Sequence, residues 1–254
     1  MLQLSTPQPA RQANPTIKAQ ALAYLIFERP DLAAAETFLT DFGLRIALRD
    51  SDARYFRGTG SAPFCYVVRQ AEQARFVGMG FRVASRADLA KLAALPGASA
   101  VRPLNAPGGG EVVSLTDPAG FTVEAVFGQT PVAAIPHRQP LPANQPDQLP
   151  RINATQRPPH AAAEIIKLGH AVIEVADFQQ VCAWYTGHLG LSPSDVQVLS
   201  DGTPIVTFMR LYLGDTPADH HTLAIAQGFM NGYNHSAYEV VDIDALGMGQ
   251  RVLR

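Results

Sequence analysis

The sequence predicts an α+β fold of tandem βαβββ modules, with two modules in each of two domains and an incomplete last module. Three features of the sequence support this prediction. Short apolar strands and single amphipathic helices alternate along the chain. A proline-rich stretch at residues 129–165 separates two parts of similar pattern. The second part also repeats individual residues of the first at a nearly constant spacing.

The first module begins with an apolar strand at residues 21–27, which stops before Pro30. Asp31 is a helix N-cap, and the apolar residues that follow keep the helical period as far as Gly43, a typical C-cap. Three short strands are predicted next, at residues 45–48, 53–56 and 64–68.

The second module begins with a strand at residues 76–83 and continues as a helix from Ser85 through Leu92. It closes with strands at residues 111–115 and 121–126, which are joined by the turn Asp117-Pro-Ala-Gly120.

These patterns divide the chain into four parts. Residues 1–17 mix Pro, Gln, Ser and Asn without periodicity and are expected to be a disordered tail. Residues 18–128 form an N-terminal domain of paired modules without metal-binding residues. Residues 129–165 contain eight prolines and are expected to be an extended linker that docks on the domains. Residues 166–254 form a C-terminal metal-binding domain.

The internal repeat identifies the residues that distinguish the second domain. An offset of 146 residues places Tyr24–Asp31 on His170–Asp177, and an offset of 157 places residues 64–68 on residues 221–225. The second copy therefore has His170, His221 and His235 where the first has Tyr24, Phe64 and Gly78. Packing alone does not require these histidines, because the first copy lacks them. The repeat also predicts that the counterpart of residues 117–124 lies beyond Arg254.

Composition excludes several classes of partner. The chain has 254 residues, of which 47% are hydrophobic and 17% charged, and its net charge is -2. It has no basic cluster, so nucleic acid and anionic membranes are not expected partners. No apolar run reaches the ~18 residues of a membrane helix, and we expect a cytoplasmic protein. Cys65 and Cys182 lie far apart in apolar segments and are expected to be buried and reduced.

The three histidines stand at the heads of three predicted strands, an arrangement that suits a divalent transition metal. A single histidine in an apolar strand is more often a hydrogen-bonded core residue. Glu174 and Glu239 follow His170 and His235 by four residues, about 13 Å along a strand, so neither can easily bind the same ion as its neighbour. A carboxylate ligand is therefore not evident in the chain.

Several segments together resemble the vicinal oxygen chelate superfamily and, within it, the two-domain extradiol ring-cleavage dioxygenases. They are residues 168–175 (LGHAVIEV), 184–191 (WYTGHLGL), 219–225 (DHHTLAI), 234–240 (NHSAYEV) and 117–120 (DPAG). The resemblance covers nearly the whole chain after residue 18. The His-Thr-Leu-Ala run, about fourteen residues before His235, resembles extradiol enzymes more than glyoxalases or resistance proteins.

The resemblance implies that His170 and His235 are metal ligands and that His221 is an acid/base residue. It implies a non-heme Fe(II), although the sequence does not distinguish Fe(II) from Mn(II). The third ligand, a glutamate of the last strand, is expected beyond Arg254, so the full-length form is expected to be active and this chain to lack a ligand. The implied substrates are a catechol-type aromatic diol and O2, and we expect a homo-oligomer.

Two alternatives remain at this point: a non-redox binding protein, and a glyoxalase-type metal isomerase or lyase of the same fold. His220 is expected to face away from His221 because of strand alternation. Phe208, Leu211, Tyr238 and Val240 are candidates for the pocket wall, and each is explained equally well as core.

Overall fold

The computed structural model describes residues 8–155, 157 and 159–254. The first domain contains β1 (Ala21–Arg29), α1 (Leu32–Phe42), β2 (Arg45–Arg49), β3 (Ala53–Arg57), β4 (Tyr66–Gln70), β5 (Arg75–Arg82), α2 (Arg86–Ala93), β6 (Arg102–Pro103), β7 (Glu111–Thr116) and β8 (Thr122–Phe127). The second contains β9 (Ile165–Val175), α3 (Phe178–Leu189), β10 (Ser192–Val198), β11 (Pro204–Arg210), β12 (Leu223–Gln227), β13 (Gly232–Val240) and α4 (Ile243–Val252).

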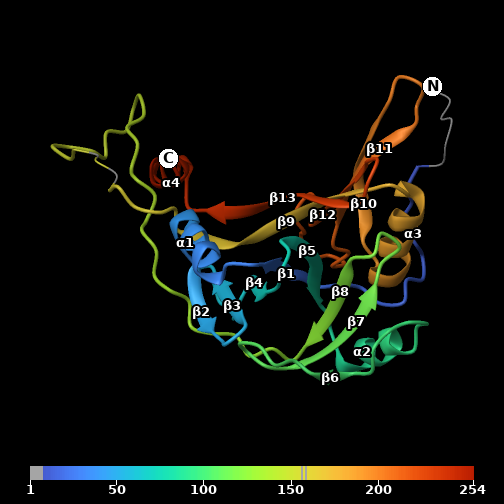
Figure 1. Ribbon diagram of the computed structural model, residues 1–254. Coiled ribbons are helices and arrows are strands. Elements are labelled where there is room, and N and C mark those ends of the chain that lie inside the picture. The colour runs from blue at the N-terminus through green and yellow to red at the C-terminus, as the bar shows by residue number, and fades with distance from the viewer. Residues whose placement is uncertain (1–7, 156, 158) are drawn as a thin grey trace.

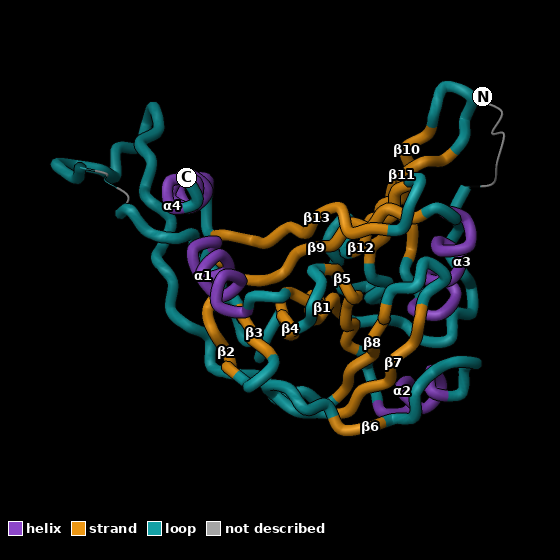
Figure 2. Tube along the Cα trace, viewed as in Figure 1, coloured by secondary structure: helices purple, strands orange, loops and turns teal. Residues whose placement is uncertain are grey.

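The strands form two sheets, and the predicted α+β fold of tandem βαβββ modules is confirmed. The first domain is an eight-stranded sheet in the order β2-β3-β4-β1-β5-β8-β7-β6. The second is a five-stranded sheet in the order β10-β11-β12-β9-β13, which lies above the first in Figure 1. The tube in Figure 2 shows α1 and α4 at one end of the molecule and α2 and α3 at the other.

The first helix begins and ends as its sequence predicts. The Asp31 carboxylate accepts hydrogen bonds from the backbone N–H groups of Ala33 and Ala34, which satisfies two of the free donors at the start of α1. Gly43 ends the helix with φ 115°, a left-handed conformation that favours glycine. A Cβ atom at Gly43 would also lie 1.8 Å from the carbonyl oxygen of Ala163. Because Gly43 has no side chain, the linker can pass close to the end of α1 at Ala163.

The two domains repeat one another in strand pairing as well as in sequence. Tyr24 of β1 is paired with Gly80 of β5, and the equivalent His170 of β9 is paired with Ala237 of β13. The parallel pair Leu25 and Tyr66 likewise corresponds to Ala171 and Leu223. The structural register thus reproduces the sequence offsets of 146 and 157 residues.

Strand alternation decides which side chains of β9 enter the core between the two sheets. Ala171, Ile173 and Val175 are buried in that core, in the same way as Leu25 and Phe27 of β1. Residues that alternate with these along β9, including His170, point to the opposite face of the second sheet. The equivalent face of the first sheet is closed by a smaller cluster that contains Tyr24, Ile26 and Phe64.

A buried hydrogen bond joins the domains where α3 packs against the first sheet. The Tyr185 hydroxyl donates to Asp117 Oδ2 at 2.9 Å, and Asp117 Oδ1 accepts from the backbone N–H groups of Ala119 and Phe121. Burial raises the pKa of Asp117, although these hydrogen bonds oppose the rise. The turn predicted at Asp117–Gly120 is therefore also a contact between domains.

Tyr185→Phe is expected to lower the free energy of unfolding by about 1–3 kcal/mol, because it leaves a buried carboxyl group without one donor. Urea denaturation measures this change. Tyr212→Phe is a matched control, since the ring of partly exposed Tyr212 packs against Arg11 and Lys18 and keeps those contacts. Equal stability of Tyr185→Phe and the unmodified protein would show that the hydrogen bond contributes nothing.

The N-terminal segment contacts the second domain within residues 1–17, the part of the chain that was predicted to be a disordered tail. Residues 1–7 of that prediction lie outside the described residues. Thr16 and Ile17, however, donate backbone hydrogen bonds to the carbonyl oxygens of Gly187 and His188, near the C-terminus of α3. Ile17 is buried. The segment is ordered because it buries an apolar side chain and satisfies free carbonyl groups at a helix end.

The linker follows the surface of the first domain before it reaches β9. The backbone N–H groups of Val132 and Ile135 donate to the carbonyl oxygens of Ser61 and Thr59. Further along, the Arg138 guanidinium pairs with the Asp242 carboxylate, which also caps α4. These contacts hold described residues of the linker against both domains, and residues 156 and 158 lie outside the described part.

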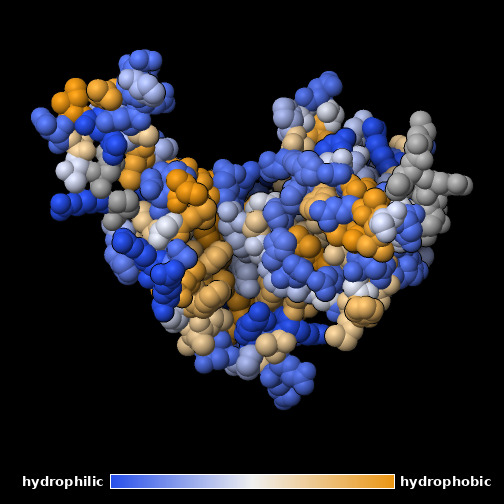
Figure 3. Space-filling model, turned by 90° about the horizontal axis from the view of Figure 1, so that it is seen from above, coloured by the Kyte–Doolittle hydropathy of each residue, from blue (hydrophilic) through white to orange (hydrophobic). Residues whose placement is uncertain are grey.

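Exposed and buried residues are distributed as in a globular protein. Seen from above in Figure 3, hydrophilic residues cover most of the face and hydrophobic ones form separate patches. Cys65 and Cys182 are both buried and free, as expected. In the described ranges no helix has the length and apolar character needed to cross a membrane.

Candidate metal centre

His170 and His235 approach each other across the pairing of β9 and β13. Their Nε2 atoms lie 3.4 Å apart. Two imidazole nitrogens that share one divalent ion, each about 2.1 Å from it, are separated by roughly 3.0–3.4 Å for angles between octahedral and tetrahedral. The spacing of this donor pair thus fits a single metal ion, and the two imidazoles come from adjacent strands as the sequence predicts.

The orientation of His235 is set by a chain of polar side chains. Asn234 Nδ2 donates to Glu174 Oε1 at 2.5 Å, which turns the Asn234 carbonyl oxygen toward His235. That oxygen lies 2.7 Å from His235 Nδ1. Because the amide oxygen can only accept, this arrangement assigns the proton to Nδ1 and leaves the lone pair on Nε2. Nε2 is the atom that faces His170.

His221 packs against His170 at the side of this pair. The centroids of the two imidazole rings are 4.1 Å apart, and the Phe208 ring meets His221 edge-on at 5.1 Å. His221 lies in the loop before β12, whereas His170 and His235 lie within β9 and β13. The prediction that all three stand at strand heads is therefore wrong in detail, but the three side chains do meet.

The expected orientation of His220 is also wrong. Its Nδ1 atom lies 3.2 Å from His221 Nδ1, and its ring centroid is 5.9 Å from that of Phe208. Strand alternation does not apply here, because β12 begins only at Leu223. Four histidines thus form a continuous group on this face of the second sheet.

Burial and mutual repulsion keep the inner histidines neutral near pH 7. Burial lowers the pKa of His170 to about 4, and charge on His221 or His235 acts in the same direction. Burial, followed by the proximity of His220 and His235, also lowers the pKa of His221. Neutral imidazoles have the lone pair that a metal ligand or a general base requires.

Neither of the neighbouring carboxylates is a third ligand, in agreement with the strand-spacing argument. Glu239 pairs with Lys167 at 3.2 Å and is half-exposed, whereas Glu174 holds Asn234. Within residues 8–155, 157 and 159–254, no group of three or more His, Cys, Asp or Glu side chains is arranged to hold a metal ion. The described residues thus bring together two candidate ligands, His170 and His235, with His221 alongside.

The four candidates for the pocket wall lie in different places. Phe208 contacts His221 and His220, as a wall residue should. Leu211 lines a separate pocket between the domains. Tyr238 packs edge-on against Phe42, and Val240 packs against the same shared core. Only Phe208 of these four contacts the histidine group.

The first domain shows what occupies the equivalent place without histidines. The Tyr24 and Phe64 rings stack with centroids 4.5 Å apart, in the same relation as His170 and His221. The Tyr24 hydroxyl donates to Glu124 Oε2 at 2.7 Å. Glu124 lies on β8, which pairs in parallel with β5 and places Glu124 opposite Gly80. The first domain therefore has a buried carboxylate beside the counterpart of His170.

Comparison with known proteins shows which fold the chain shares. Residues 167–247 match the model of the Glyoxalase/Bleomycin resistance protein/Dioxygenase superfamily. The Mn(II)-bound glyoxalase from Novosphingobium aromaticivorans has a similar structure, with a TM-score of 0.73 and 21% identity over 93% of this chain and 71% of that one. The chain has the vicinal oxygen chelate fold.

Its relatives by sequence are dioxygenases. The chain is 28% identical to metapyrocatechase 2 of Cupriavidus necator over 94% of its own length and 71% of the relative. It is 29% identical to biphenyl-2,3-diol 1,2-dioxygenase of Paraburkholderia xenovorans over 90% of its length and 74% of the relative. A substrate complex of homoprotocatechuate 2,3-dioxygenase from Brevibacterium fuscum shares the fold, with a TM-score of 0.69 and 20% identity, over 97% of this chain and 74% of that one.

Proposed function

We propose that the protein is an extradiol dioxygenase that opens a catechol-type aromatic ring with O2 at a non-heme Fe(II). The observation that carries the proposal is the pair of Nε2 atoms of His170 and His235, 3.4 Å apart, with the His221 ring packed beside them. Sequence relatedness to metapyrocatechase 2 supports this choice of chemistry.

His170 and His235 are the proposed protein ligands of the metal. Together with a carboxylate they would hold a ferrous ion, which would supply the means of bringing a diol and dioxygen within reaction distance of each other. The chain from Glu174 through Asn234 keeps His235 in the tautomer that such a ligand needs. His170 remains neutral because its partial burial, together with the nearby His221 and His235, lowers its pKa to about 4.

The internal repeat indicates where a third, carboxylate ligand would stand. In the first domain Glu124 reaches the Tyr24 hydroxyl from a strand parallel to β5, opposite Gly80. The counterparts of Tyr24 and Gly80 are His170 and Ala237. We therefore place the carboxylate on a strand parallel to β13, opposite Ala237, where it would face His170.

His221 is the proposed acid/base residue. Its Nδ1 atom faces His220, so Nε2 is the atom available to a substrate hydroxyl group. A neutral imidazole at this point can accept the hydroxyl proton and later return it to the opened ring. Phe208, edge-on to His221, limits the rotation of the imidazole and adds an aromatic wall beside it.

An oxygen-consumption assay tests the proposal on the natural gene product that contains these 254 residues. The protein is loaded with Fe(II) under anaerobic conditions and mixed with catechol or 2,3-dihydroxybiphenyl in air-saturated buffer. We expect equimolar uptake of O2 and diol, and a product whose mass equals that of the diol plus O2. A folded, iron-loaded protein that consumes neither substrate would refute the proposal.

A glyoxalase-type isomerase or lyase is the second candidate, and it is favoured by the fold shared with a Mn(II)-bound glyoxalase. Dependence on O2 distinguishes the two. The dioxygenase requires O2 as a substrate, whereas an isomerase turns over equally well under anaerobic conditions. Turnover of a hemithioacetal without O2, with no reaction toward diols, would support the second candidate.

Asn234→Leu is expected to weaken Fe(II) binding about 10–100-fold, because the variant keeps His235 but loses the acceptor that fixes its tautomer. Equilibrium dialysis measures the affinity. Asn144→Leu, in the linker, is the matched control and should bind as the unmodified protein does. Unchanged affinity in Asn234→Leu would show that the Glu174–Asn234–His235 chain has no part in metal binding.

A further inference from the structure

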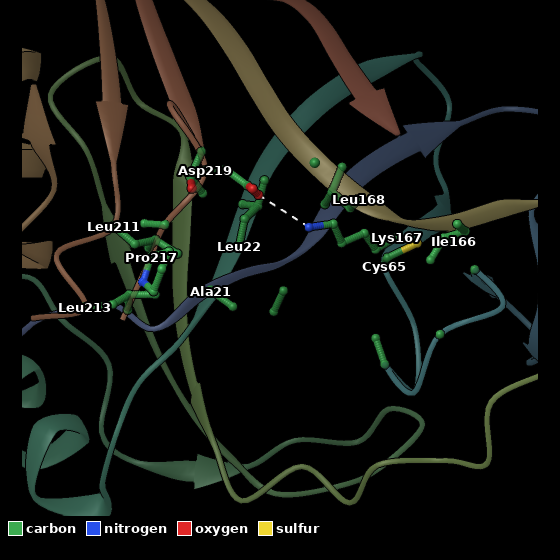
Figure 4. A pocket seen from close by; sticks show the side chains of 17 residues that line it. Ala21, Leu22, Cys65, Ile166, Lys167, Leu168, Leu211, Leu213, Pro217 and Asp219 are labelled. Carbon is green, nitrogen blue, oxygen red and sulfur yellow. Dashed lines mark hydrogen bonds and ion pairs between the residues drawn. The ribbon is translucent and has the colours of Figure 1, made fainter. Parts of the chain in front are cut away.

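We infer that the pocket between the two domains binds a neutral, ring-sized molecule that carries a hydroxyl group. This pocket has a volume of about 310 Å³ and is formed by the first residues of β1 and β9 together with the loops beside them. Figure 4 shows its side chains, with Leu22 and Leu168 approaching from the two domains and Lys167 directed toward Asp219. No residue of the histidine group lines it.

The pocket lies where equivalent residues of the two domains meet. Several residues that line the pocket from the first domain have counterparts that line it from the second domain. These counterparts lie at the offsets of 146 and 157 residues that define the internal repeat. Examples are the pairs Ala21 and Lys167, Leu22 and Leu168, Ala62 and Asp219, and Cys65 and Thr222. The first-domain members of these pairs are small or apolar, whereas three of the second-domain members are polar. Duplication thus formed a cavity between the domains, and the second copy gave one side of it polar character.

The size and walls of the pocket suit a ring. An apolar cavity of about 150 Å³ is enough to bind benzene. This pocket has about twice that volume, and most of its wall consists of alanine, glycine, leucine and proline residues. Burial of Cys65 raises the pKa of its thiol to about 12, so the sulfur stays uncharged and contributes an apolar surface. Such a site favours a compact apolar ligand over an extended polar one.

The polar side of the pocket selects against anionic ligands. Lys167 Nζ lies 3.4 Å from Asp219 Oδ2 and 3.2 Å from Glu239 Oε2, so two carboxylates surround one ammonium. Their net charge of about -1 disfavours a carboxylate ligand. A hydroxyl group suits the pair, because it can donate to the Asp219 carboxylate and accept from the Lys167 ammonium.

Binding of 4-fluorophenol, followed by ¹⁹F NMR, tests the inference. We expect saturable binding, with 4-fluorobenzoate at least about tenfold weaker because of the surrounding carboxylates. Ala218→Phe places a ring inside the pocket and should abolish binding, whereas Ala33→Phe on the exposed face of α1 should leave it unchanged. Asp219→Leu keeps the cavity, removes the charged acceptor and should weaken binding by about tenfold.

A variant of the histidine group separates this pocket from the proposed active site. His235→Ala removes one proposed metal ligand but no residue of the pocket wall, so its affinity for 4-fluorophenol should equal that of the unmodified protein. Loss of binding in His235→Ala, or full binding in a folded Ala218→Phe variant, would overturn the inference. Tighter binding of 4-fluorobenzoate than of 4-fluorophenol would overturn the proposed ligand class.

Discussion

Replacement of His170 by alanine is expected to abolish both Fe(II) binding and diol-dependent O2 uptake. The variant loses one of the two nitrogens whose 3.4 Å spacing fits a common ion. We expect the affinity for Fe(II) to fall by more than about 100-fold, which exceeds the loss that follows removal of an outer hydrogen-bond partner. Equilibrium dialysis and an oxygen electrode measure the two effects on the same preparation.

His160→Ala, which removes an exposed histidine of the linker, is the matched control and should keep both properties. Tyr24→Phe is a second control from the equivalent site of the first domain. Its unfolding free energy should fall because Glu124 loses a donor, but its Fe(II) affinity should not change. Retention of stoichiometric iron by His170→Ala would contradict the assignment of this ligand.

His221→Ala is expected to separate binding from turnover. The variant keeps His170 and His235, so its Fe(II) affinity should stay close to that of the unmodified protein. Turnover should fall by about 10²–10⁴-fold, because the substrate hydroxyl loses its proton acceptor. Measurement of kcat at saturating diol, together with iron content, separates the two effects.

His220→Ala distinguishes a direct role of His221 from a general effect of the histidine group. His220 contacts His221 Nδ1 and lies on its outer side, so its removal should lower kcat much less than the loss of His221. Normal turnover by His221→Ala would remove His221 from the proposed chemistry, and loss of iron from that variant would make it a ligand instead.

The fold could be predicted from the sequence because its elements have strong local signals. Asp31 and Gly43 delimit α1, and the alternation of apolar residues gives most strands of the first domain to within two residues. The internal repeat added information that no single segment contains. Because Tyr24 and His170 occupy the same place in the two sheets, their difference made His170 a candidate for a role other than packing.

The polar contacts around the histidines could not be predicted in the same way. The roles of Asn234 and Glu174 depend on how side chains of two adjacent strands meet, and strand periodicity does not give that register. The orientation of His220 was predicted wrongly because this residue lies in the loop before β12, which does not follow strand alternation. The proximity of Asn234 to His235 in the sequence was the one signal that could have indicated its role.

The pocket residues were difficult to assign because an apolar side chain of the second domain can face either the shared core or the histidine group. Tyr238 and Val240 are apolar in the sequence in the same way as Phe208, yet they pack in the core shared by the two domains. Leu211 lines the pocket between the domains and does not contact the histidines. Periodicity indicates that a side chain is buried. The packing of the two sheets determines whether it is buried in the shared core or on the opposite face of its sheet.

The most direct test of the proposed metal centre is a crystal structure of the protein soaked in Fe(II) under anaerobic conditions, with anomalous data collected at the iron edge. The expected result is one anomalous peak within about 2.2 Å of the Nε2 atoms of both His170 and His235. A peak at another place, or no peak at a concentration that saturates the protein in solution, would contradict the assignment of these two histidines as the metal ligands.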